Sequence, residues 1–180
     1  MKDDVKREIT LAAKRDEVLS HMWSELHLKI SSVEKNISIL RRKNTAMLKK
    51  IIKDRGFPTS DVVGKKGMHD VFYIVQHSDH DLAFQKRCLK QFERVTATGK
   101  ADKRDLTYLT DRVLVNSGRK QVYGTQVDTT GRTIKLCPTI DVKNLDRRRK
   151  DAGLTPYKEY LRSFYKFGGL PKTRQFKLYK

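Results

Sequence analysis

The chain has 180 residues, of which 37% are hydrophobic and 34% charged, so it is long enough to bury one core but is more charged than an average globular domain. Forty Lys and Arg residues against 21 Asp and Glu give a net charge of +19, which favours polyanions, nucleotides or anionic surfaces as partners. No signal peptide or membrane-spanning apolar run is found, and Cys88 and Cys137 lack disulfide or zinc spacing, so we expect a reduced, cytoplasmic protein that contacts no membrane.

The N-terminal region predicts long helices, because no Pro or Gly precedes Gly56. From Leu19 to Ile51 apolar residues recur at alternating steps of four and three, with Asn44 as the polar exception. This stripe is typical of a coiled coil or of a helical hairpin, in which Ser32 would cap the second helix. We expect two antiparallel helices over residues 3–55, packed within the same domain as the rest of the chain.

The following region predicts shorter elements. Helices are expected from about 68 to 80, from 81 to about 95 and from 104 to 115, followed by a β-hairpin of strands 121–127 and 132–136 around a turn. A short helix over 145–152 and another starting at Thr155 complete the domain. The predicted fold is mostly α with a short β-hairpin (α+β), a single-domain helical bundle over 1–165 whose part from about 56 onward carries the motifs. Residues 166–180 are expected to form a basic, flexible tail.

A dense polar cluster at residues 76–81 is the first candidate site, and three interpretations of it stay open. His77 could be a general base or acid, with its tautomer fixed by Asp79 or Asp81. Alternatively, His77 and His80 could hold a divalent metal with His69, although the spacing is a weak metal signal. In the third interpretation Asp79 only caps the next helix.

Two further polar segments follow. Asp111 and Arg112 form either a surface ion pair or an arginine aimed at a phosphate, with the aspartate orienting it. Tyr123 and Gln126 flank a glycine and a threonine in residues 121–126, which are either an ordinary strand or a ligand-contacting segment. The basic run 146–150 is either a solvated helix face or the source of a phosphate clamp.

These motifs, in this order, resemble an uncharacterised bacterial domain family that is catalogued only as a numbered domain of unknown function. The resemblance rests on Asn44-Thr45, Gly56-x-Pro58, Gln76-His77-x-Asp79, and the segments 84–85, 108–112, 121–126 and 147–154, and spans about residues 44 to 161. Phe57 stands where the family usually has Trp, which favours a packing role there. The resemblance implies a fold and a set of candidate residues but no reaction.

We therefore expect an enzyme-like domain that binds an anionic small molecule, such as a nucleotide or phosphate ester, for hydrolysis or group transfer. No cofactor or metal is expected, because no four-ligand set of Cys and His has suitable spacing. The alternatives are a non-catalytic nucleic-acid-binding module and an interaction protein that uses its N-terminal stripe. The candidate catalytic residues are His77, oriented by Asp79, and Asp111, and the candidate binding residues are Arg112, Tyr123, Gln126, Arg147 and Arg148.

Overall fold

The computed structural model describes residues 2–25, 31–128 and 134–167 of the chain. The expectation of a mostly helical domain with a short β-hairpin is confirmed. The proposed tail falls almost entirely outside the described residues. The described elements are α1 (Lys2–Glu25), α2 (Ser31–Arg55), α3 (Ser60–Gln76), α4 (Leu82–Ala97), α5 (Lys103–Asn116), β1 (Val127–Asp128), β2 (Lys135–Leu136), η1 (Val142–Asn144), α6 (Leu145–Asp151) and α7 (Tyr157–Phe167).

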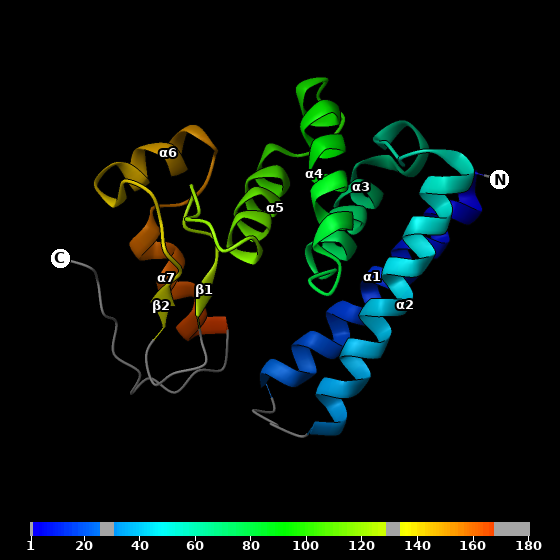
Figure 1. Cartoon of the computed structure of the whole chain (residues 1–180), viewed down its shortest axis with the longest axis horizontal. Coiled ribbons are helices and arrows are strands. Elements are labelled where there is room, and N and C mark those ends of the chain that lie inside the picture. Colours follow the sequence, from blue (N-terminus) through cyan, green and yellow to red (C-terminus); the bar gives the residue numbers. More distant parts are fainter. Residues whose placement is uncertain (1, 26–30, 129–133, 168–180) are drawn as a thin grey trace.

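The first two helices lie side by side and run in opposite directions, as Figure 1 shows. Asn44 on α2 donates a hydrogen bond to the backbone carbonyl of Ala12 on α1 at 3.2 Å, and Arg41 reaches Asp16 one turn further along. The face that α1 buries begins well before Leu19 and includes Val5, Ile9, Ala12 and Ala13. Of the stripe expected from Leu19 onward, Ile37 and Ile51 on α2 are buried, whereas Leu26 and Ile30 lie outside the described residues.

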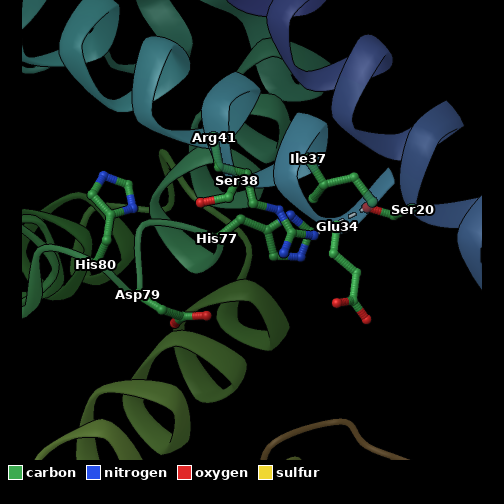
Figure 2. Close-up of a pocket in the computed structure, with 8 residues that line it drawn as sticks. All are labelled: Ser20, Glu34, Ile37, Ser38, Arg41, His77, Asp79 and His80. Carbon is green, nitrogen blue, oxygen red and sulfur yellow. Dashed lines mark hydrogen bonds between the residues drawn. The ribbon is translucent and has the colours of Figure 1, made fainter. Parts of the chain in front are cut away.

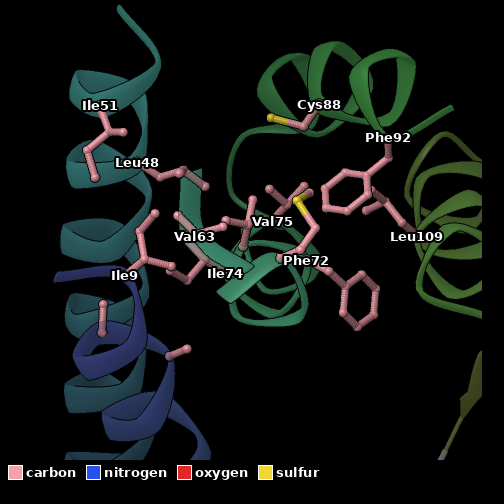
Figure 3. Packing of buried hydrophobic residues seen from close by; sticks show 14 of the residues in the cluster. Ile9, Leu48, Ile51, Val63, Phe72, Ile74, Val75, Cys88, Phe92 and Leu109 are labelled. Carbon is pink, nitrogen blue, oxygen red and sulfur yellow. The ribbon is translucent and has the colours of Figure 1, made fainter. Parts of the chain in front are cut away.

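Helix α3 is the central element of the fold, because it contacts α1, α2, α4 and α5. Its side chains Val71, Ile74 and Val75 are buried in the main core together with residues of the surrounding helices, among them Ile9, Leu48, Phe92 and Leu109 (Figure 3). Burial of apolar area on this scale is the main source of folding free energy. The core thus fixes the direction of α3 and of the turn that follows it.

Two predicted elements differ from the structure. The helix expected from residue 68 starts earlier, at Ser60, with a break at Gly64, whose φ of 75° is outside the helical range. It also ends earlier, at Gln76, so that His77 to Asp81 form a turn. Of the strand expected over 121–127 only its last residue is in β1, and the preceding segment is an irregular loop. The hairpin turn and the start of the second predicted strand lie outside the described residues.

Candidate functional site

A cavity of about 500 Å³ opens between the α1–α2 hairpin and the turn that follows α3. Figure 2 shows how His77 points into it from the turn while Arg41 approaches from α2. Its lining residues come from three segments that are distant in sequence: Ser20 on α1, Glu34, Ile37, Ser38 and Arg41 on α2, and His77, Asp79 and His80 of the turn.

The turn is fixed beneath α2 by polar contacts at both ends. The hydroxyl of Ser78, which is fully buried, bonds to that of Thr45 on α2 at 2.8 Å and donates to the carbonyl of Ile74 at 2.8 Å. Asp81 forms an ion pair with Lys49 and accepts a hydrogen bond from the first turn of α4, so it is the N-cap of that helix. These contacts position Asp79 and His80 between them, and His77 directly before Ser78.

A buried carboxylate orients the imidazole of His77. Its Nδ1 lies 2.9 Å from Oδ2 of Asp16 on α1, whose side chain is only 1% exposed, whereas that of His77 is 18% exposed. The other oxygen of Asp16 accepts from Arg41 Nε at 3.1 Å and from Ser20 Oγ at 3.1 Å. The second ring nitrogen of His77, Nε2, has no hydrogen-bond partner among the described residues. The pair thus leaves one ring nitrogen available.

The charges around this pair favour a neutral imidazole. Burial lowers the pKa of His77, as do the positive charges of Arg41 and Arg112, against the hydrogen bond to Asp16, which raises it. Burial acts to raise the pKa of Asp16, but its contacts with His77 and Arg41 hold that pKa below the ordinary value. An ionised Asp16 can only accept, so Nδ1 carries the proton of the neutral ring and Nε2 carries the lone pair. The neutral ring therefore presents an unprotonated nitrogen, Nε2.

Asp79, expected to orient His77, instead binds the side chain of Arg112 on α5. The guanidinium contacts both carboxylate oxygens, with Nε at 2.8 Å, and its Nη1 donates to Gln126 Oε1 at 2.9 Å. Asn116 also donates to Asp79, at 2.7 Å. Burial acts to raise the pKa of Asp79, but these donors hold it low. Asp79, Arg112, Asn116 and Gln126 are therefore linked to one another, and Asp79 lines the cavity together with His77.

Asp111 lies away from the cavity lining and organises the loop at 121–126. Its side chain is 0% exposed and accepts from the backbone amides of Val122 at 2.8 Å, Tyr123 at 3.0 Å and Thr125 at 2.9 Å. The hydroxyl of Thr125 adds a fourth donor at 3.0 Å, and Gly124 turns the chain with a φ of 64°. A carboxylate with this many donors has little capacity left for a ligand. This geometry supports a structural role for Asp111.

The remaining predicted residues lie in or beside the same loop rather than in the cavity. Tyr123 contributes its backbone carbonyl, which accepts from Arg149 Nη1 at 2.8 Å. Arg148 donates to the carbonyls of Val122, at 2.9 Å, and of two residues near η1, while Arg147 is exposed on α6. Arg149, which was not among the predicted site residues, is 0% exposed and its guanidinium carbon lies 4.7 Å from the ring centre of Tyr160. The basic run therefore fastens the loop.

The two other interpretations of the 76–81 cluster gain no support. In the ranges that the structure describes, no group of three or more His, Cys, Asp or Glu side chains is arranged to hold a metal ion. The helix after the cluster is capped by Asp81 and not by Asp79.

No helix in the described part of the chain is long and apolar enough to cross a membrane.

Comparison with known proteins gives one match. The model of a family of unknown function, DUF6624, matches residues 4–172. The chain belongs to this family. No curated protein and no solved structure matches it. For this DUF6624 chain, any statement about the reaction therefore depends on the geometry of the cavity.

Proposed function

We propose that the cavity at His77 is an active site for hydrolysis or group transfer on an anionic substrate such as a phosphate ester or nucleotide. The observation that supports this most is the pair formed by buried Asp16 and His77, with Nε2 unpartnered among the described residues beside a cavity of about 500 Å³. A buried Asp that fixes the tautomer of a neutral His is the arrangement that hydrolases use to make a general base.

Arg41 is the group best placed to bind the anion. It lines the cavity, and its Nε and Nη2 bond to Asp16 and Ser20, while Nη1 has no partner within the described ranges. A guanidinium held by two bonds is preorganised for a phosphate oxygen. Arg112 contributes positive charge from the far side of Asp79. We therefore assign the anion-binding role that was expected of Arg112 mainly to Arg41.

In the proposed reaction the oxygen of a water molecule or of an acceptor hydroxyl attacks phosphorus, and His77 Nε2 accepts the proton that this oxygen loses. Asp16 stabilises the imidazolium that forms, and Arg41 stabilises the negative charge on the phosphoryl oxygens. The bond from phosphorus to the leaving oxygen then breaks, and the imidazolium returns its proton to that oxygen. No group other than water or the acceptor is consumed.

The test is a substrate screen followed by two substitutions. Ligands are found by shifts in melting temperature across nucleotides and phosphate esters, and turnover is measured on the hits. His77→Gln and Asp16→Asn should each lower kcat by roughly 100-fold or more, as expected for loss of a general base or its tautomer. His21→Gln, at an exposed position on α1, is the matched control and should keep full activity.

The proposal fails if His77→Gln retains wild-type turnover on a confirmed substrate. It also fails if the substitution only destabilises the protein by about 1–3 kcal/mol, as loss of a structural hydrogen bond would, while activity per folded molecule is unchanged.

A second candidate, non-catalytic nucleic-acid binding, is favoured by helix α4. Lys86, Lys90 and Arg94 are exposed at successive spacings of four residues, and the structure gives none of them an acidic partner among the described residues. Like charges at this spacing destabilise a helix by about 0.2–0.5 kcal/mol per pair, so the arrangement has a cost that phosphate contacts would offset.

Neutralising these three cations to Gln tests this candidate. The slope of log K for duplex DNA against log salt should fall by about 0.9 for each phosphate that the variant no longer neutralises. A matched variant neutralises three exposed α1 cations, Lys6, Arg7 and Lys14. Equal effects of the two variants would mean that only net charge matters and would exclude a binding face on α4.

A further inference from the structure

A second histidine–aspartate pair lies on α3, outside the cavity at His77. Nδ1 of His69 is 3.0 and 2.9 Å from the two carboxylate oxygens of Asp105 on α5. The imidazole is 59% exposed while the carboxylate is 11% exposed, so the buried acid again orients an accessible ring. Nε2 of His69 bonds to no residue in the part of the chain that the structure describes.

Two hollows meet at this ring, with volumes of about 280 and 420 Å³. Both are lined by His69, Asp102 and Asp105, and we call their combined space the His69 cleft. One wall is aromatic and consists of Phe72, Tyr73 and Tyr108, the first of which lies 5.5 Å from the imidazole between ring centres. The cleft therefore combines a polar end with a flat apolar wall.

The polar end of the His69 cleft holds both cations and carboxylates, and the carboxylates act on the imidazole. The hydrogen bond that Asp105 accepts from Nδ1 raises the pKa of His69; burial opposes this shift, and the charges of Asp105, Asp70 and Asp102 add to it. The nearby carboxylates thus favour the protonated ring. Asp105 is occupied by Nδ1, and Asp102 accepts from the backbone amide of Arg104 at 2.7 Å. The charged groups that face the imidazole or line the cleft are Lys65, Lys100, Arg104, Asp70, Asp102 and Asp105.

We propose that the His69 cleft is a second ligand site, which binds a phosphate monoester carrying an aromatic group. The phosphate would accept a hydrogen bond from Nε2 of His69, with Lys65 and Arg104 supplying further positive charge, because the structure pairs neither side chain with an acid within the described ranges. The aromatic group would pack on Phe72 and Tyr108. This site needs no reaction at His77 and is thus independent of the proposed catalytic role.

The two sites are neighbours, since His69 is on α3 and His77 directly follows its last residue. The histidines are eight positions apart, which corresponds to about 12 Å of helix rise. Tyr73 lies between them, since it lines the His69 cleft and its ring centre is 4.3 Å from that of His77. An aromatic group bound in the cleft would therefore contact Tyr73, whose ring packs on His77.

The experiment follows the histidine ring signals of the full chain by NMR while phenyl phosphate is added, with inorganic phosphate as a second probe. We expect the signals of His69 to shift and phenyl phosphate to bind at least 10-fold more tightly than inorganic phosphate. His69→Gln, at an exposed ring that can be replaced without emptying the core, should weaken binding 10-fold or more, and Arg104→Gln should also weaken it. Affinity should fall as pH rises and His69 loses its proton.

The matched control is Lys90→Gln, at an exposed position on α4 outside the cleft lining, which should leave binding of phenyl phosphate to the His69 cleft unchanged. The proposal is overturned if His69 does not shift at millimolar phenyl phosphate, or if His69→Gln binds as the wild type does. Equal affinity for the two probes would overturn the aromatic part of it. Shifts confined to His77 would overturn this site while supporting the proposed active site, so failure of one is distinguishable from failure of the other.

Discussion

Replacement of Asp111 by Asn tests most directly whether this carboxylate is structural, as its contacts indicate, or catalytic, as its sequence context suggested. The oxygen of the introduced Asn can still accept hydrogen bonds from one set of backbone amides. Its NH2 group, however, then faces other N–H donors, either that of Thr125 or those of Val122 and Tyr123. A buried amide left unpaired costs about 1–3 kcal/mol, and the remaining bonds lose their charge assistance. We expect a total loss of about 3–5 kcal/mol, a large part of a typical stability of about 5–15 kcal/mol.

The loss is measured by guanidinium unfolding, and amide hydrogen exchange at Val122, Tyr123 and Thr125 locates it in the loop. Asp54→Asn, which removes only an exposed i,i+4 ion pair, is the control and should change stability by less than about 0.5 kcal/mol. A loss below about 1 kcal/mol, with the three amides still protected, would refute the reasoning. Loss of ligand binding in a stable Asp111→Asn variant would restore the hypothesis that Asp111 places the anion.

Three further predictions concern other buried groups. Arg149→Lys should cost about 2–4 kcal/mol in guanidinium unfolding, since one ammonium cannot replace a fork that donates to three backbone carbonyls. The pKa of His77 in the folded protein lies below its unfolded value of about 6.5, so the unfolded chain binds more protons below that pH. The free energy of unfolding of the wild type should therefore fall relative to that of His77→Gln as pH drops below about 6.5. Parallel stability profiles of the two proteins from pH 5 to 8 would contradict this. Cys88, whose pKa burial raises to about 12, should resist iodoacetamide at pH 8 and react only after unfolding, as mass spectrometry can follow.

The helices could be predicted where their signals are local. The helix expected from 81 and the one expected from 104 are α4 and α5, and each begins within a residue of its expected start because Asp81 and Asp102 cap them with hydrogen bonds to nearby amides. The strand expected over 121–127 failed for a non-local reason. Its composition favours β structure, but three of its amides bond to a carboxylate on α5, so they are not available to a partner strand.

The candidate site was predictable only in part. The polar cluster at 76–81 drew attention to His77, but the residue that orients it, Asp16, is 61 positions away, and no local pattern pairs them. A signal existed nonetheless. Asp16 continues the buried stripe of Val5, Ile9 and Ala12 at helical spacing, and a charged residue on an apolar face must be paired when it is buried. The stripe identified from Leu19 onward began too late to show this exception.

The requirement that buried polar groups be paired also links the cavity to the distant loop at 121–126. Asp111 holds Thr125, whose hydroxyl accepts from Gln126 Nε2 at 3.1 Å, and Gln126 Oε1 accepts from Arg112, which in turn binds Asp79. Each of these side chains is a hydrogen-bond partner of the next. Removal of one therefore leaves its neighbour without that partner in a region of low dielectric. The polar motifs in residues 76–81, 110–112 and 121–126 are thus consecutive parts of one hydrogen-bonded network. Its far end fixes Asp79 at the cavity, and substitutions in the loop should therefore act on the cavity through Arg112.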